Sequence, residues 1–191
     1  MKTLVRCAVV GLVALAAASA RAEDVPGLVK QLKSRDVEAR RKAATALAEA
    51  GSEAQPAIPA LITALKDQDL YVRRFAAQAL GKIGPDAKSA VPALSTALKD
   101  DKKQVAEAAA EALGRIRVSA ARPLIDAVKD KGNEAAVRRK AIEALGAMGS
   151  EAKSAVSVLT DALKDREIQT EAATALGEIG PAAKPAVPAL T

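Results

Sequence analysis

The sequence predicts an all-α fold, a right-handed α-α superhelix built from stacked pairs of helices. The first observation is a motif, V-R-R-F-A-A-Q-A-L-G-K-I-G at residues 72–84, that recurs at residues 39–51, 105–117, 137–149 and 168–180. Leucines anchor the copies at steps of 33, 33, 32 and 31 residues: Leu47, Leu80, Leu113, Leu145 and Leu176. The second observation is a shorter apolar segment, usually with an early proline, before each copy. A period in this range predicts a solenoid in which each unit packs on its neighbours.

Residues 1–22 precede the first repeat and have the pattern of a secretory signal peptide. Lys2 and Arg6 give a basic start, residues 8–18 are uncharged and mostly apolar, and Ala20-Arg21-Ala22 supplies a small-x-small cleavage pattern. The apolar run is shorter than the roughly 20 residues that a membrane-spanning helix needs. We expect cleavage after Ala22, with the bond after Ala20 as the alternative, and a periplasmic or secreted protein without membrane contact once it is cleaved.

Cleavage would change the composition of the protein. The whole chain has 29 basic and 23 acidic residues, a net charge of +6, and removing the three basic residues of the signal leaves 26 against 23, or +3. The cut also removes Cys7, the only cysteine. We therefore expect a mature chain, residues 23–191, that depends on packing rather than disulfides for its stability.

Each repeat unit is predicted to contain a helix A, a tight Lys-Asp turn and a helix B. A proline in the first turn of helix A sacrifices little, because the first N–H groups have no partner within the helix. In helix B of the second unit, Val72, Ala76 and Leu80 fall on one apolar side at helical spacing. Gly84 is expected to end this helix in the left-handed conformation, which costs glycine little.

Five helix pairs and a truncated sixth are predicted, at residues 24–51, 56–84, 89–117, 120–149, 154–180 and 185–191. The first unit is the most polar, as a capping repeat should be. The third departs from the pattern, with Ala106-Glu107 in place of an arginine pair and Arg117 in place of the final glycine, so we expect a change of curvature there. The sixth unit has only its A helix, which leaves three alternatives: a longer array, a stub that serves as a cap, or self-association through the uncapped C-terminal end.

The combination of early proline, Lys-Asp turn and V-R-R-x-A-A-x-A-L-G-x-I-G motif resembles HEAT repeats. It is most similar to the short, alanine-rich repeats of phycobilisome-lyase-like proteins, over residues 24–191. The resemblance implies that the B helices line the concave side of the array. It also implies that Arg40, Arg73 and Arg138, which recur at one motif position, form a structural ladder by bridging to turn aspartates.

The sequence argues against an enzyme and against a bound metal or cofactor. It contains no histidine, so imidazole metal ligands and Ser-His or Cys-His pairs are excluded. The HEAT-repeat hydroxylases hold iron with His-Glu motifs, which this chain lacks. A bilin-lyase-like activity is disfavoured because aromatic residues make up 1% of the chain and offer a flat tetrapyrrole little to stack on. The carboxylates at the turns are expected to cap helices.

The exposed stripe of helix B is the predicted binding surface for a protein or peptide. Tyr71 and Phe75 are four residues apart on one helix face beside Arg74, the residue types that dominate interface hot spots. The alternative is that the two rings only fill a gap over a neighbouring helix. A nucleic-acid partner is disfavoured, because the stripe mixes both signs of charge. The candidate residues of this surface are Tyr71, Arg74, Phe75, Gln78, Lys82, Arg41 and Arg139.

Overall fold

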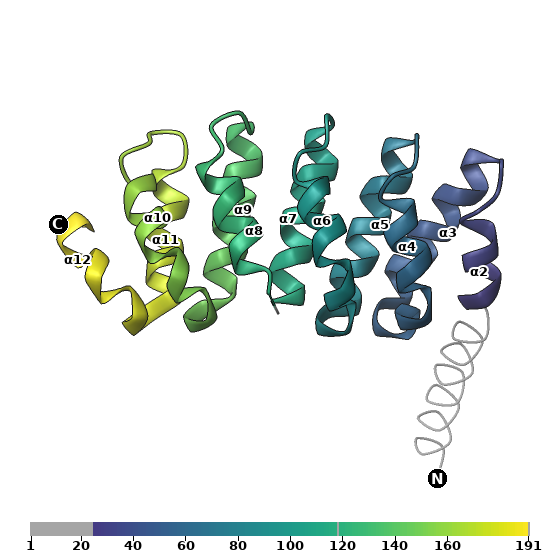
Figure 1. Ribbon diagram of the computed structural model, residues 1–191, viewed down its shortest axis with the longest axis horizontal. Coiled ribbons are helices and arrows are strands. Elements are labelled where there is room, and N and C mark those ends of the chain that lie inside the picture. The colour runs from purple at the N-terminus through teal and green to yellow at the C-terminus, as the bar shows by residue number, and fades with distance from the viewer. Residues whose placement is uncertain (1–24, 118, 191) are drawn as a thin grey trace, which may run out of the picture.

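The protein is a single row of paired helices (Figure 1). The computed structural model describes residues 25–117 and 119–190, and within these ranges all regular secondary structure is helical. The predicted all-α superhelix of stacked helix pairs is confirmed. The predicted signal peptide, residues 1–22, lies outside the described residues, and so does Thr191. No helix of the described ranges combines the length and the apolar character needed to cross a bilayer.

Three kinds of helix alternate along the row. The A helices are short: α2 (Val25–Gln31), α4 (Ile58–Ala64), α6 (Val91–Ala97), α8 (Ala121–Lys129), α10 (Val156–Ala162) and α12 (Val187–Leu190). The B helices are longer: α3 (Val37–Ala50), α5 (Leu70–Ile83), α7 (Lys103–Ile116), α9 (Ala135–Ala147) and α11 (Gln169–Ile179). Four 3-10 helices lead into A helices: η1 (Gly51–Ala57), η2 (Gly84–Ala90), η3 (Gly149–Ala155) and η4 (Gly180–Ala186).

The glycine after helix B has a different conformation from the one predicted. Gly84 has φ +77° and ψ −141°, whereas the left-handed helical conformation requires ψ near +47°. Gly51 and Gly180 repeat this geometry, with ψ of −126° and −136°. The expected left-handed cap is therefore wrong: the chain turns directly into a 3-10 helix, and the backbone region that this turn uses is accessible in practice only to glycine.

The repeated leucines form the centre of one continuous core. Leu47, Leu80, Leu113 and Leu145 of the B helices are fully buried, as are the A-helix leucines Leu61, Leu94, Leu124 and Leu159. The predicted apolar side of α5 is confirmed, since Val72, Ala76, Ala79, Leu80 and Ile83 are all buried. The inner B helices α5, α7 and α9 pack against a B helix on each side, so these units depend on their neighbours.

The link between α7 and α8 differs from the other unit boundaries. Arg117 and Ser119 both have positive φ, of 63° and 59°, which is uncommon outside glycine. The Arg117 side chain donates to the Met148 carbonyl at 3.0 Å and pairs with Glu151 at 2.9 Å. These bonds hold the irregular link against the start of η3. The change of curvature expected here stays a prediction.

Candidate functional site

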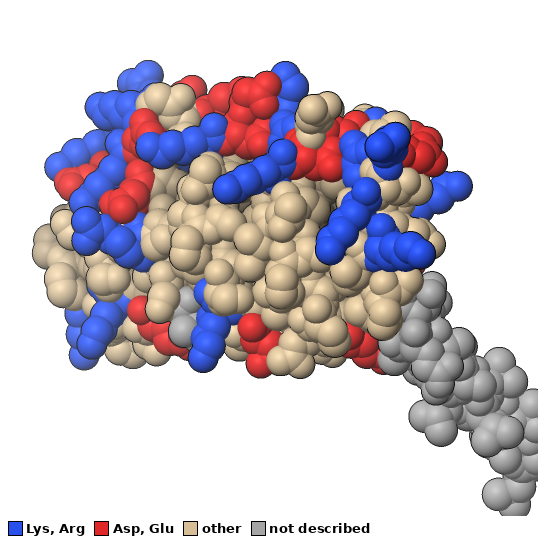
Figure 2. Space-filling view, turned by 45° about the vertical axis from the view of Figure 1, so that its right-hand side comes forward, with Lys and Arg blue, Asp and Glu red and all other residues tan. Residues whose placement is uncertain are grey.

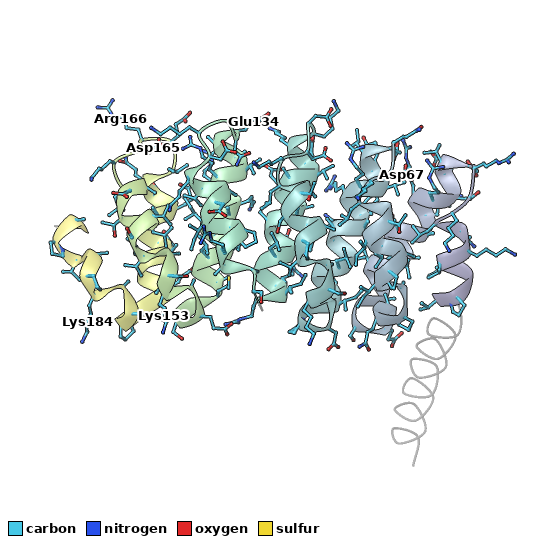
Figure 3. The ribbon with its side chains drawn as sticks, in the orientation of Figure 1. Asp67, Glu134, Lys153, Asp165, Arg166 and Lys184 are labelled. Atoms are coloured by element: carbon cyan, nitrogen blue, oxygen red, sulfur yellow. The ribbon has the colours of Figure 1, made fainter. Side chains whose placement is uncertain are left out.

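The A–B turns carry a row of charged side chains along one edge of the solenoid. Figure 3 shows Asp67, Glu134 and Asp165 at this edge, with Lys153 and Lys184 at the opposite edge. In Figure 2 the turn edge is at the top. Lys and Arg side chains gather there together with Asp and Glu side chains, above a broad band of mostly uncharged residues. Because the turns of successive units are neighbours here, an arginine in one unit can reach a carboxylate in the next.

Two of the three predicted ladder arginines form bidentate bridges of this kind. Arg40 donates from Nε and Nη2 to the Asp67 carboxylate at 2.7 and 3.0 Å. Arg73 donates to Asp100 in the same way, at 2.7 and 2.9 Å. Each bridge joins residues 27 positions apart and connects two units. The hydrogen bond to the aspartate raises the pKa of each arginine.

The same arginines also hold the turn of their own unit. Arg73 donates from Nη1 to the carbonyls of Asp67 and Gln68 at 2.9 and 3.1 Å, and Arg40 does the same to Ser34 and Arg35. Asp67 accepts a further bond from the Asp69 backbone N–H at 2.9 Å. One guanidinium therefore fixes two consecutive turns, and charge-assisted bonds of this type are the strong ones.

Arg138 is oriented differently from the other two ladder arginines. It donates from Nη1 to Asp165 at 2.7 Å and from Nη2 to Glu167 at 2.9 Å. The bond from Arg138 is the main cause of a lowered pKa at Asp165. Arg138 is only 6% exposed, and its Nε–H finds no acceptor among the described residues. Its fork spans two carboxylates instead of one.

Arg41, a candidate for the binding surface, is also held by the next unit. Its Nε donates to Asp69 Oδ1 at 2.9 Å, and its Nη1 to Glu38 at 2.8 Å. Asp69 is at the same time the N-cap of α5, because it accepts the backbone N–H groups of Tyr71 and Val72. The bond from Arg41 lowers the pKa of Asp69 to about 2.

The Tyr71 and Phe75 rings stack on each other, and each ring also contacts the guanidinium group of an arginine. The ring centroids are 6.5 Å apart with 27° between the planes. The guanidinium carbon of Arg41 lies 4.8 Å from the Tyr71 centroid, and that of Arg74 lies 5.8 Å from the Phe75 centroid. Phe75 is half-buried against the core, while Tyr71 is 43% exposed. The two rings therefore differ: Phe75 contributes mainly to packing, and Tyr71 presents the larger accessible surface.

Three adjoining hollows run along the B helices of the second to fourth units, and we call them the B-helix groove. Their volumes are about 170, 180 and 320 Å³, and Glu111 lines all three. Small residues on α5, α7 and α9, such as Gly81, Ala108 and Gly114, leave the space. The polar rim consists of Arg74, Gln78, Lys82, Gln104, Glu107, Glu111, Arg115, Lys140 and Glu143.

The rim carries charges of both signs, some of them paired within one helix. Arg115 pairs with Glu111 at 2.7 Å, and Lys140 pairs with Glu143 at 2.6 Å, a bond that raises the Lys140 pKa. Of the predicted surface residues, Arg74, Gln78 and Lys82 line the groove. Tyr71 and Phe75 lie on α5, the helix that carries all three, and Arg139 is 4.0 Å from Glu171 and lines none of the three hollows.

Comparison with known proteins agrees with this repeat geometry. The family model for HEAT repeats matches residues 25–114, 58–136 and 121–191. The chain belongs to the HEAT-repeat family. A search of curated proteins gave no match.

Solved structures similar to this HEAT-repeat chain include natural and engineered solenoids. An engineered protein studied by a structural genomics consortium is 32% identical with a TM-score of 0.64, over 87% of this chain and 85% of that one. A computationally designed armadillo repeat protein for modular peptide recognition is 22% identical, with a TM-score of 0.57 and coverage of 86% and 90%. Yeast importin-beta is 18% identical with a TM-score of 0.66, over 82% of this chain but 25% of its own.

The carboxylates of this HEAT-repeat chain serve its own turns and helix ends. Within the described ranges, no cluster of three or more His, Cys, Asp or Glu side chains has the arrangement of a metal site. The carboxylates of the turns accept bonds from arginines and backbone N–H groups, as at Asp67 and Asp69. The B-helix groove combines hydrogen-bond donors and acceptors on its rim with small side chains between them.

Proposed function

We propose that this HEAT-repeat protein is a non-catalytic scaffold that binds an extended segment of a protein partner in the B-helix groove. The observation that carries the proposal is the continuity of the groove across α5, α7 and α9, with Glu111 common to all three hollows. A segment in this groove would contact three units at once. The charges of both signs on the rim would fix the register of the segment, because complementary charge sets specificity and orientation.

The comparisons support a protein partner by analogy. One similar structure is a computationally designed armadillo repeat protein for modular peptide recognition. We extend this to the present chain as a proposal. We also propose that the protein acts outside the cytoplasm, in the periplasm or secreted, on the evidence of the signal-like residues 1–22.

Alternative functions have less support. The resemblance to phycobilisome-lyase-like repeats keeps a bilin-lyase type of activity as the second proposal, but the two aromatic residues are already stacked with each other and with Arg41 and Arg74. A hydroxylase would need histidine ligands that the sequence lacks. Self-association through the C-terminal end is a further proposal, for which the 52% exposed Val187 is the relevant observation.

The test is a crosslinking pull-down from envelope and secreted fractions with the purified protein and two double variants. The groove variant is Gln78→Lys with Gln104→Lys, at two neutral positions of the rim, and the matched control is Thr63→Lys with Thr96→Lys, on exposed positions of α4 and α6. Both variants add the same two lysines, and circular dichroism checks that both remain folded.

We expect a specific partner to be captured by the wild type and the control and lost by the groove variant. Equal capture by both variants would contradict the groove as the binding surface. Absence of any specific partner in all three samples would contradict the scaffold proposal itself. A separate single variant, Tyr71→Glu, tests whether the exposed tyrosine ring contributes to capture of the partner.

A further inference from the structure

The arginine–aspartate ladder lacks its arginine in the third unit, and also in the fifth, which has Gln169. Seven residues before the anchor leucine, the first, second and fourth units have Arg40, Arg73 and Arg138, but the third has Ala106. The aspartate that this missing arginine would bridge is present. Six residues after the A-helix leucine, Asp67, Asp100 and Asp165 accept from ladder arginines, and Asp130 occupies the same position after Leu124.

Asp130 is consequently the ladder carboxylate without a guanidinium. Its Oδ1 accepts the Gly132 backbone N–H at 3.0 Å, as the other turn aspartates accept the N–H two residues on. Within residues 25–117 and 119–190, the cation near its Oδ2 is Lys99, at 3.7 Å. This distance is too long for a hydrogen bond. The Lys99 side chain is 74% exposed, and an exposed pair of this kind contributes little.

A cavity occupies the position of the missing side chain. It has a volume of about 340 Å³ and is lined by Ala106 and Asp130 together with Lys99, Asp100, Lys103 and Glu134. Figure 3 shows Glu134 at the same edge of the molecule as Asp67 and Asp165, the edge of the ladder. Asp130 is also more accessible than its counterparts: its side chain is 40% exposed, against 13% for Asp67, 11% for Asp100 and 33% for Asp165.

We propose that this cavity, the ladder gap, binds a guanidinium group that the chain itself does not supply. In the second unit the guanidinium of Arg73 bonds the Asp100 carboxylate with two nitrogens and the carbonyls of Asp67 and Gln68 with the third. By the repeat register, the equivalent acceptors are the Asp130 carboxylate and the backbone carbonyls of Asp100 and Asp101, and of these residues Asp130 and Asp100 line the cavity.

This acceptor set selects guanidinium over ammonium. A planar fork can bond both carboxylate oxygens and still present a third nitrogen to the carbonyls, whereas an ammonium group acts as a point charge. Lys99 lies beside Asp130 without forming a hydrogen bond, so the carboxylate remains available to an incoming group. The incoming group would displace it into solvent. The ladder gap is on the turn edge and shares no lining residue with the B-helix groove, so this inference does not rest on the proposed function.

Amide chemical shifts provide the test. The ¹⁵N-labelled protein is titrated with N-acetylarginine amide and, as the matched control, N-acetyllysine amide. We expect saturable shifts at Gly132 and Asn133, next to Asp130, with the arginine compound and much weaker shifts with the lysine compound. In Ala106→Arg the internal side chain should fill the gap and abolish the shifts. In Asp130→Asn the apparent Kd should rise about tenfold or more, because one side of a charge pair is lost.

Several results would overturn the proposal: no saturable shift at Gly132 or Asn133, equal shifts with both compounds, or undiminished binding in Ala106→Arg. If Ala106→Arg does not fold, Asp130→Asn is the deciding variant. Asp130 is a partly exposed turn residue, so this substitution should leave the fold intact.

A second titration distinguishes the two sources of a guanidinium. A short Gly-Ser peptide with one central arginine is compared with N-acetylarginine amide. Tighter binding of the peptide identifies the gap as a site for an arginine side chain of a protein partner. Equal affinities identify a site for a free guanidinium compound.

Discussion

Gly114 of α7 lies directly against Ala144 of α9. A Cβ atom added to Gly114 would be 2.7 Å from the Ala144 Cβ and 3.0 Å from its Cα. The same relation joins Gly81 to Ala112, and in both cases the glycine follows one anchor leucine and the alanine precedes the next. The B helices therefore meet at backbone distance, and the repeated A-L-G sequence determines how closely they stack.

Replacing this glycine with alanine should destabilise the protein even though alanine favours helices. For Gly114→Ala we expect a loss of about 1–3 kcal/mol, the usual cost of overpacking a close contact. Denaturant unfolding followed by circular dichroism measures it.

The matched control is Gly177 on α11, at the same motif position, where an added Cβ would meet nothing within 4 Å. Gly177→Ala should instead stabilise the helix by about 0.5–1 kcal/mol. Equal effects of the two substitutions would show that helix propensity, rather than stacking, governs this position.

The ladder should contribute strongly to stability in the second unit. Arg73→Ala leaves Asp100 largely buried without its bidentate partner, since the two side chains are 12% and 11% exposed. Removing one member of a buried ion pair leaves the other as an uncompensated buried charge. We expect the free energy of unfolding to fall by roughly 3 kcal/mol.

Arg74→Ala is the control one residue away, because Arg74 makes a ring contact with Phe75 and no ion pair within the described residues. It should cost less than about 1 kcal/mol. A double-mutant cycle with Asp100→Ala isolates the pair, and a coupling energy near zero would contradict the ladder as a stabilising feature.

Much of this fold could be predicted from the sequence because the residues that specify each helix pair are close together in the chain and recur in every unit. The spacing of Leu47, Leu80 and Leu113 sets the unit, and the small residues of helix B indicate close stacking on two sides. The 3-10 helices could not be predicted in the same way, because the helix-end glycine motif at Gly84 does not show which conformation the glycine takes when a 3-10 helix follows it.

The candidate surface was predictable only in part. Gln78 and Lys82 belong to the groove, but its centre at Glu111 emerges only when three units are stacked. Arg41 looked like a free surface residue because its partner, Asp69, is 28 positions away in the chain. The sequence showed that Ala106 breaks the arginine pattern, but the cavity left there depends on the spacing of neighbouring turns.

Stability should fall in acid through Asp69. Its usual pKa of 3.8 is lowered to about 2 in the folded protein by the bond from Arg41. A depressed folded pKa contributes stability that is fully present above the unfolded pKa and is lost as the pH falls through the folded one. The contribution of Asp69 should therefore be complete above about pH 4 and decline between pH 4 and 2. Asp69→Asn removes this dependence, so the difference in melting temperature from wild type should narrow across that window. A constant difference from pH 6 to 2 would rule out the pairing as its cause.

The anchor leucines should be the positions where a single truncation does most damage. Leu80 is fully buried between neighbouring units, and Leu80→Ala deletes side-chain volume that the flanking helices cannot easily fill. We expect a loss of about 2–5 kcal/mol, measured as a lower midpoint of chemical unfolding. Val187→Ala, at a position 52% exposed, removes apolar volume without opening a cavity and should stay within about 0.5 kcal/mol of wild type.

Because each unit is stabilised by its neighbours, the effect of Leu80→Ala should extend beyond its own helix: amide exchange should accelerate in α3 and α7 as well as in α5. Faster exchange confined to α5 would contradict the coupling of units through these leucines.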